Sequence, residues 1–378
     1  MKKNIESLVV LDLHLDLAYD ALFWNRDLAR TVDQIRLIEH DGPPQVAADV
    51  SNGICTVTFP ELRRGRVGIV LSTIMSRIQN RDGHMRDGMR TQEQAMAIGR
   101  GHLAYYQTMS KRGYFKPVLN LEDLCEAVDV WSDPAIKTAN TPIYHILSME
   151  SADPIESPDD VQFWWEAGLR VVGPAHFGDN TYIHGTGTEG GLKTPAADLF
   201  KSMREVGMVL DITHMADKAV WESFKEWDGP VMASHCTCRS LVPGQRHLHD
   251  DMIKELIRRG GVIGLVFCQN FIDPDIPWEN RHLLNHKGRE PKYGMDALIP
   301  HVEHIGNLAG GSIANISIGT DMDGGFGAEL TPADVSTIAD VGSFASVLCS
   351  AGYTEEDAKA ILHGNAIRFF RESWRHGL

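Results

Sequence analysis

Two residues near the start of the chain, His14 and Asp16, have the types and spacing of metal ligands. They end an apolar run that begins at Leu8, and alternation along an extended strand points both side chains the same way. An imidazole beside a carboxylate suits a divalent cation such as Zn²⁺. Taken alone, such a pair is more commonly a buried histidine that is hydrogen-bonded to a carboxylate.

Similar residues stand at the ends of other apolar runs. Each is a weak signal on its own, because a buried histidine commonly bonds to a backbone carbonyl and a terminal carboxylate is often a helix cap. Their coincidence is harder to explain in that way, since together with the first pair they place three histidines and three carboxylates at the same end of different strands. We therefore predict one shared metal site. The further residues are Glu150, His214, His235 and Asp321.

Six such ligands are more than one tetrahedral zinc requires. Because a carboxylate can bridge two cations, the set predicts two metal ions that hold a hydroxide between them and polarise the carbonyl that it attacks. The carboxylate that is left over can carry a proton to the leaving amine. The residues alone therefore predict metal-dependent hydrolysis of an amide or an ester.

The elements that must position these residues are short runs rich in Val, Ile and Leu, separated by amphipathic segments, a pattern typical of parallel strands buried on both faces. Eight such strands favour a closed (β/α)8 TIM barrel of the amidohydrolase-like type over a doubly wound open sheet. Only a closed barrel gathers all the strand ends into one mouth, and no Gly-x-Gly-x-x-Gly follows the first strand. The expected strands begin at Leu8, Val67, Tyr144, Leu169, Gly207, Pro230, Gly261 and Ile316.

We expect residues 1–378 to form a single barrel domain, because neither a repeat nor a low-complexity linker marks a second one. Two long excursions interrupt the alternation, at about residues 17–66 and 268–300. Both contain Pro, Gly and aromatic residues without strong periodicity, so we expect loops. Since the loops after strands build the active face of a barrel, these segments are candidate walls or lids.

The composition is that of an ordinary globular protein. Its 36 basic and 51 acidic residues give a formal charge of −15, which argues against nucleic acid and anionic membranes as general partners. Neither a signal-like segment, a membrane-spanning run nor a membrane anchor is found, which favours a cytoplasmic protein. The six cysteines are expected to be free thiols. Cys236 and Cys238 lie close together, but no second pair at zinc-finger spacing accompanies them.

Ordered motifs along nearly the whole chain resemble one known family, the membrane (renal) dipeptidases and their bacterial relatives, the M19 metallopeptidases. Each fragment is short, but together they are specific. They read DLHLD, SMESAD, GPAHFGDN, DITHMAD, ASH, HVEHIGNLAG followed by ISIGTDMDGG, and HGNAIRFF.

The resemblance implies a role for each predicted ligand. It implies that His14 and Asp16 bind one zinc ion, that Glu150 bridges both, and that Asp321 touches the metal site and serves as the proton shuttle. The second zinc would be bound by the two remaining histidines, His214 and His235. Two Zn²⁺ ions are the cofactors that the family favours, although manganese, iron or cobalt also suit such ligands.

The resemblance also implies how a substrate is held. His176 matches the family histidine that stabilises the scissile carbonyl oxygen, and Arg246 matches the arginine that binds the terminal carboxylate of a dipeptide. A guanidinium fork fits a carboxylate well. Alternatives remain open, since His176 can be an ordinary loop histidine, Arg246 a solvated charge, and Arg239 a competing carboxylate ligand. The implied substrates are dipeptides, including those with a D-residue at the C-terminal position, and a homodimer is plausible.

Three departures from the family pattern bear on the substrate. Leu13 replaces a glycine before the first metal histidine, Phe177 stands where asparagine is common, and residues 236–240 read CTCRS. One alternative is therefore another binuclear amidohydrolase, which acts on acylated amino acids or cyclic amides. The other is a catalytically inactive, metal-stabilised barrel that only binds a ligand.

Other ionisable residues near these motifs are expected to have structural roles. Asp323 is predicted to lie in the turn after the last strand, outside direct contact with the metals. His301 and His304 fit one face of a helix, so we expect them to pack rather than to bind metal.

Overall fold

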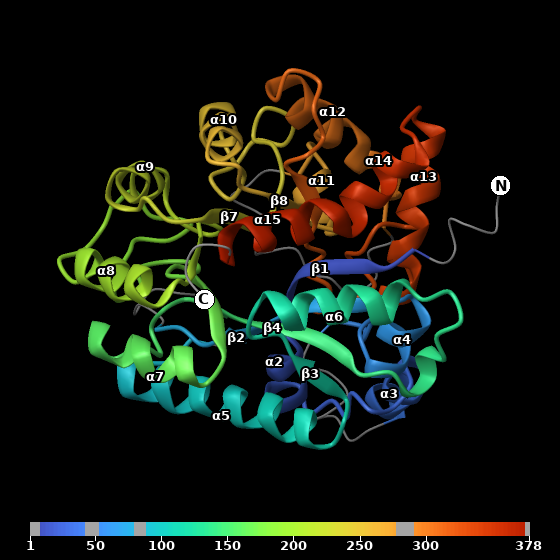
Figure 1. Cartoon of the computed structure of the whole chain (residues 1–378), viewed down its shortest axis with the longest axis horizontal. Coiled ribbons are helices and arrows are strands. Elements are labelled where there is room, and N and C mark those ends of the chain that lie inside the picture. The colour runs from blue at the N-terminus through green and yellow to red at the C-terminus, as the bar shows by residue number, and fades with distance from the viewer. Residues whose placement is uncertain (1–7, 42–52, 79–87, 277–290, 375–378) are drawn as a thin grey trace.

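The computed structural model describes residues 8–41, 53–78, 88–276 and 291–374. All pairings among its nine strands are parallel, and a pairing of β2 with β4 closes eight of them into a barrel (Figure 1). Each of the eight predicted strands is present, so the prediction of a (β/α)8 TIM barrel is confirmed. The barrel strands are β1 Val10–Leu15, β2 Val67–Met75, β4 Ile143–Glu150, β5 Leu169–Gly173, β6 Val209–Asp211, β7 Val231–Cys236, β8 Ile263–Leu265 and β9 Ile316–Ile318.

A ninth strand, β3 Phe115–Pro117, was not expected from the sequence. It pairs with the first residues of β4, whereas β2 pairs with β4 from Tyr144 to Glu150. Strand β3 is therefore an addition outside the closed ring. Its three residues include a lysine and a proline, so neither length nor apolar pattern marks it as a strand.

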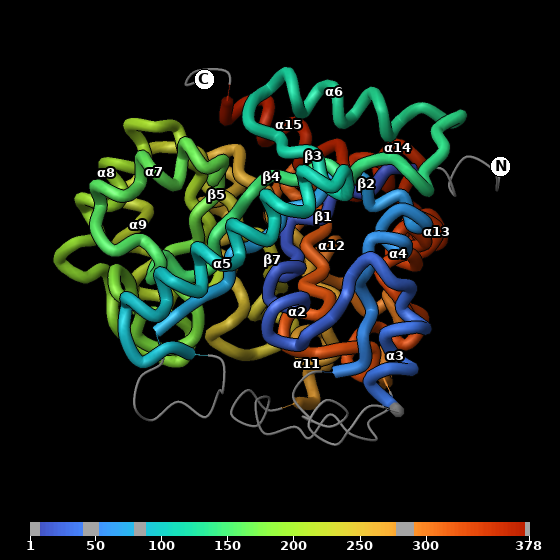
Figure 2. The backbone as a smooth tube through the Cα atoms, turned by 90° about the horizontal axis from the view of Figure 1, so that it is seen from below, coloured from blue at the N-terminus to red at the C-terminus, as the bar shows by residue number. Residues whose placement is uncertain are grey.

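Helices surround the barrel, and the long helix α5 runs along its outside (Figure 2). Helix α10 shows how the sequence specifies them, because Met252, Ile253 and Leu256 recur at helical spacing and are buried. The helices are α2 Leu17–Phe23, α3 Val32–Asp41, α4 Phe59–Arg64, α5 Gln92–Lys111, α6 Leu121–Ser132, α7 Val161–Glu166, α8 Ala196–Val206, α9 Asp217–Glu226, α10 Asp250–Arg258, α11 Gln269–Ile272, α12 Ile299–Leu308, α13 Phe344–Ser350, α14 Glu355–Lys359 and α15 Asn365–Trp374. None of those in the described part of the chain is long and apolar enough to cross a membrane.

The two excursions contain more regular structure than their weak periodicity indicates. Residues 17–66 include α2, α3 and α4, and residues 268–300 include α11 and the start of α12. Residues 42–52 and 277–290 lie outside the described residues. Short helices of about two turns carry too few repeats for a periodic pattern to be recognised.

Asp323 attaches the first excursion to the end of β9. Its buried carboxylate accepts hydrogen bonds from the backbone N–H groups of Thr56 and Val57, from the Thr56 hydroxyl at 2.6 Å and from Arg26 Nη1 at 3.2 Å. These contacts join segments that are 267 residues apart. Asp323 therefore connects the excursion to the barrel, which agrees with the expected structural role.

Two glycines allow close packing of the backbone at the carboxyl ends of β7 to β9. A Cβ atom placed on Gly264 or on Gly319 would lie 1.8 Å from the carbonyl oxygen of Ser234. Since Ser234 directly precedes His235, this close approach fixes the strand end that carries the histidine.

We expect Gly264→Ala to lower the thermal unfolding midpoint strongly, with a cost of about 3 kcal/mol or more, because the clashing atom belongs to the backbone and cannot rotate away. The matched control is Gly101→Ala in α5, where a Cβ atom meets nothing within 4 Å. That change should instead stabilise the protein by roughly 0.5–1 kcal/mol. Equal midpoints for the two variants would contradict the packing described for the strand end.

Candidate metal centre

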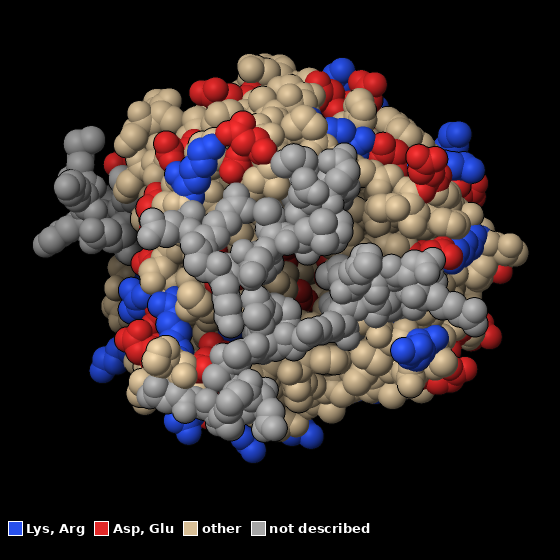
Figure 3. All heavy atoms as spheres, turned by 180° about the vertical axis from the view of Figure 1, so that it is seen from behind, with Lys and Arg blue, Asp and Glu red and all other residues tan. Residues whose placement is uncertain are grey.

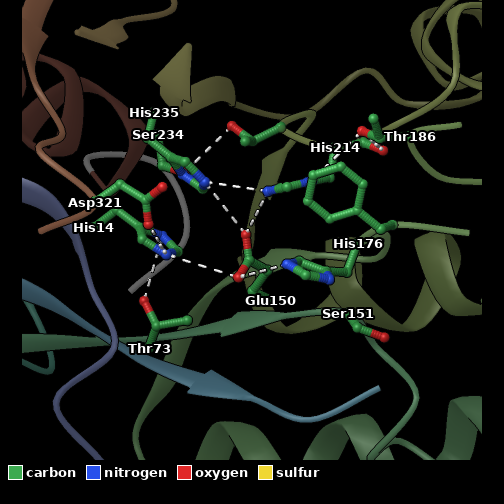
Figure 4. Close-up of polar contacts among 12 residues, drawn as sticks. His14, Thr73, Glu150, Ser151, His176, Thr186, His214, Ser234, His235 and Asp321 are labelled. Carbon is green, nitrogen blue, oxygen red and sulfur yellow. Dashed lines mark hydrogen bonds and ion pairs between the residues drawn. The ribbon is translucent and has the colours of Figure 1, made fainter. Parts of the chain in front are cut away.

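The six predicted metal ligands converge at the carboxyl ends of the barrel strands, and His176 joins them. Figure 4 shows His176 with five of these ligands, His14, Glu150, His214, His235 and Asp321. All seven side chains are buried. Potential ligand atoms approach within 4.8 Å of one another in three overlapping groups. The groups are His14, His235 and Asp321; Glu150, His176 and His214; and His14, Asp16 and Glu150.

The carboxylate of Glu150 lies at the centre of the cluster. Its Oε1 is 3.1 Å from His214 Nε2 and 3.4 Å from His235 Nε2. Its Oε2 is 3.7 Å from His14 Nε2 and 3.6 Å from His176 Nε2. Oε1 thus faces His214 and His235, whereas Oε2 faces His14 and His176. A carboxylate that bridges two cations requires its two oxygens to face different ligands in this way.

On the side of β1, His14 is surrounded by carboxylates. Its Nε2 lies 3.6 Å from Asp16 Oδ2 and 3.7 Å from Asp321 Oδ1. Within the described residues, His14 Nε2, Asp16 Oδ1 and Glu150 Oε1 are buried without a hydrogen-bond partner. Buried polar atoms are normally satisfied, so this set of inward-facing nitrogen and oxygen atoms fits a bound cation.

Hydroxyl groups hold the histidines from behind. Ser234 Oγ is 2.8 Å from His235 Nδ1, Thr73 Oγ1 is 3.4 Å from His14 Nδ1, and Thr186 Oγ1 is 3.5 Å from His214 Nδ1. Because each Nδ1 contacts a hydroxyl group, the Nε2 of the same ring is directed toward the centre of the cluster. Metal-binding histidines are oriented in this way by a partner on their second ring nitrogen. Sequence reasoning gave Thr73 and Thr186 no role, because a single hydroxyl residue at a strand end or in a loop carries no distinctive signal.

The backbone is strained at two of these positions. His214 has φ = 66° and Asp321 has φ = 60°, values in the left-handed region that non-glycine residues rarely adopt. Such strain persists only where the surrounding structure enforces it, and it occurs often at functional sites. The strain therefore sets these two turn residues apart from ordinary helix caps.

Burial and repulsion between carboxylates shift the pKa values of two acidic residues, Glu150 and Asp321. Burial raises the pKa of Glu150 well above its usual range, and Asp16 and Asp321 raise it further, while His14 opposes them. Burial also raises the pKa of Asp321 to about 7, against the effect of His14. Carboxylates this close need positive charge to remain ionised together, which divalent cations would supply.

The histidines divide into two electrostatic groups. Burial lowers the pKa values of His176, His214 and His235 well below the usual range, and Arg246 lowers them further. Their rings are therefore neutral, the form that binds metal. For His14 burial also lowers the pKa, but the carboxylates of Glu150 and Asp16 outweigh it and raise the pKa to about 10.

The two candidate arginines have different surroundings. Arg239 forms a two-pronged ion pair with Asp217, with N–O distances of 2.6 and 2.7 Å, so its guanidinium fork is occupied. Arg246 is buried, donates from Nη2 to the His235 carbonyl at 2.9 Å and lies over the Phe271 ring. Of these two arginines, Arg246 lies directly beside the histidine cluster, and its buried Nε has no hydrogen-bond partner among the described residues.

The departures from the family pattern lie at different places. The Phe177 ring is 5.0 Å from the His176 ring and 4.9 Å from the His214 ring, so it borders the site. Cys236 accepts a long hydrogen bond from Arg246, at 3.4 Å. Leu13 belongs to the hydrophobic core. Phe177 therefore borders the histidine cluster, and Cys236 contacts Arg246, the candidate ligand of the substrate carboxylate.

The remaining polar candidates have structural partners. His301 Nδ1 accepts a hydrogen bond from the backbone N–H of Cys238, and His304 Nε2 lies 2.8 Å from Asp250. All six cysteines are free, as expected. Cys236 and Cys238 belong to none of the potential metal-ligand groups in the described residues.

A parallel barrel with histidines and carboxylates converging at its strand ends defines the class of TIM-barrel proteins with a metal centre. The family model described as "Membrane dipeptidase (Peptidase family M19)" matches residues 2–376. The chain therefore belongs to the M19 family of metallopeptidases.

Relatives and solved structures agree with this assignment. The chain is 29% identical over 212 residues to dipeptidase tcpJ of Claviceps purpurea (strain 20.1), an alignment that covers 54% of this chain and 45% of that protein, so less than half of the Claviceps protein is spanned. The probable dipeptidase PvdM of Pseudomonas aeruginosa superposes with a TM-score of 0.75 at 17% identity, covering 99% and 97% of the two chains. A metallo peptidase from Rhodobacter sphaeroides, liganded with a phosphinate mimic of L-Ala-D-Ala, gives 0.73 at 18% identity, covering 97% and 100%.

We expect Ser234→Ala to weaken Zn²⁺ affinity about 10- to 100-fold, because His235 loses the hydroxyl that orients its Nδ1. Affinity is measured by competition with a chromogenic chelator. The control is Ser373→Ala, which removes a half-buried hydroxyl that donates to the Phe369 carbonyl within α15. Equal affinity in both variants would show that the Ser234 hydroxyl does not position the ligand.

Proposed function

We propose that this protein is a dipeptidase that uses two zinc ions, bound by His14, Asp16, Glu150, His214 and His235, with Asp321 beside them. The observation that carries the proposal is the placement of Glu150, whose two oxygens face two different sets of histidines. When bound, the zinc ions would polarise the scissile carbonyl and lower the pKa of a water molecule toward neutrality.

The residues of the chain perform the other steps of the proposed reaction. Arg246 binds the terminal carboxylate of the dipeptide, since its buried guanidinium group lies beside His235. His176, held as a neutral ring by its buried surroundings, donates a hydrogen bond to the carbonyl oxygen as negative charge develops there. Asp321, whose Oδ1 lies 3.7 Å from His14 Nε2, takes a proton from the attacking water and transfers it to the departing amine.

The proposal also covers the stereochemistry of the substrate, the cellular location and the oligomeric state. Dipeptides with a D-residue at the C-terminal position belong among the substrates, because a Rhodobacter neighbour of the same fold is liganded with a mimic of L-Ala-D-Ala. A cytoplasmic location and a homodimer complete it.

A metal analysis combined with a dipeptide panel tests this function. We expect two zinc ions per chain, cleavage of dipeptides that ceases with a chelator and returns with zinc, and little cleavage of the same dipeptides as C-terminal amides, which cannot pair with Arg246. Cleavage of acylated amino acids or cyclic amides alone would favour another amidohydrolase. Bound metal without any hydrolysis would indicate a barrel that only binds its ligand.

Asp321→Asn tests the proton transfer. We expect kcat to fall by about 10²- to 10⁴-fold, because an amide cannot deliver the proton, while the zinc content stays nearly intact. Asp296→Asn, at an exposed position, makes the same chemical change away from the site and should leave kcat unaltered. Unchanged turnover in Asp321→Asn would exclude the proton-shuttle role.

A further inference from the structure

A second cavity, of about 410 Å³, lies between α6, α15 and the π-helical turn Ala360–Gly364. Helices α6 and α15 lie side by side in Figures 1 and 2. His363 of this turn bonds through Nδ1 to the carbonyl of Val9, which directly precedes β1. Since His14 stands near the other end of β1, the cavity and the metal centre lie at opposite ends of the strand.

Positive charge dominates the lining of this cavity. Lys359, Arg368 and Arg371 line it, and Glu372 is the single carboxylate among its lining residues. Glu372 is engaged by Arg368, with an N–O distance of 2.7 Å. Within the part of the chain that the structure describes, neither Lys359 nor Arg371 forms an ion pair. Two cations therefore remain without a counter-charge.

The arginines also carry unused hydrogen-bond donors. Nε of Arg368 and Nε of Arg371 are buried without a partner among the described residues. Arg371 donates one long hydrogen bond, from Nη2 to Cys125 Sγ at 3.8 Å. An unpaired buried N–H group is unfavourable, and an oxyanion is the partner that a guanidinium group accommodates best.

The charge of the whole chain makes this cavity unusual. The formal charge is −15, so a concave surface with three cations opposes the average field of the protein. The described surface elsewhere mixes both signs, as on the face shown in Figure 3. The cavity volume is within the range of about 300–1,000 Å³ that is usual for small-molecule sites.

The proposed reaction assigns no role to the HGNAIRFF segment, and part of this segment lines the cavity. His363, Gly364, Ile367 and Arg368 of the HGNAIRFF segment line it. The segment begins within the π-helical turn, at His363, and such a local distortion is frequent at functional sites. Burial lowers the pKa of His363 to about 4 and Lys359 adds to this effect, so the ring is neutral and the cationic side chains supply the charge.

We propose that this cavity binds a small oxyanion with two or more negative charges, at a site separate from the metal centre. Phosphates and dicarboxylates share this chemistry. Arg371 and Lys359 provide the uncompensated charge, Arg368 is fixed in place by Glu372, and Val128 and Ile367 form an apolar wall for the body of the ligand.

Calorimetric titration of the zinc-loaded protein with inorganic phosphate, pyrophosphate and succinate, at constant ionic strength, tests this site. We expect saturable binding of at least one probe. If the phosphates bind more strongly, the ligand is a phosphate, and if succinate binds more strongly, it is a dicarboxylate. The double variant Lys359→Gln with Arg371→Gln should weaken the binding about tenfold or more, since charge-assisted hydrogen bonds are lost. The control, Lys201→Gln with Lys225→Gln, removes equal charge at exposed positions of α8 and α9.

Three results would overturn the proposal. One is the absence of binding for all three probes. Another is binding that survives in the double variant, since the anion would then sit elsewhere, such as at the metal centre. The third is an equal loss in the control, which would indicate a diffuse effect of net charge. Arg371→Lys retains the charge and should keep most of the binding, and unfolding midpoints without anion establish that each variant is folded.

Discussion

The structure depends on holding the carboxylates of Asp16, Glu150 and Asp321 together inside a barrel from which water is largely excluded. Burial disfavours the ionised forms of Glu150 and Asp321, and the charge of Asp16 raises the pKa of both further. His14, whose pKa these carboxylates raise, supplies one positive charge among them, whereas the neutral rings of His214 and His235 supply none. Bound cations would offset the rest of the repulsion, and the inward-facing Nε2 atoms are placed to share them.

These buried carboxylates stay close together only if the surrounding backbone is rigid. Parallel strands set the positions of the ligands, glycines on β8 and after β9 let neighbouring backbones approach the carbonyl before His235, and hydroxyl groups fix the imidazole rings. The left-handed backbone at His214 and Asp321 shows that local conformational preference yields to this geometry. Stability and site geometry are thus determined by the same contacts.

Much of this arrangement follows from the sequence because buried parallel strands give a strong pattern. The eight barrel strands are long or apolar enough to stand out, and ionisable residues at the ends of five of these apolar runs mark the site. Strand β3 was missed because three residues with a lysine and a proline give no such pattern. The helices within residues 17–66 were missed because they are short. The roles of Thr73 and Thr186, and the pairing that occupies Arg239, depend on contacts between distant segments, which spacing along the chain does not encode.

The contacts of β1 with β9 have a consequence for the order in which the protein folds. Asp12 accepts hydrogen bonds from the backbone and the hydroxyl of Thr320, 308 residues later, and Asp323 holds Thr56 across 267 residues. During synthesis, His14 and Asp16 emerge first, but the last barrel strand must be in place before Asp321 can join them. Because contacts between distant residues form slowly, the metal centre is complete only at the end of folding. A metal ion that arrives earlier meets only a partial set of ligands.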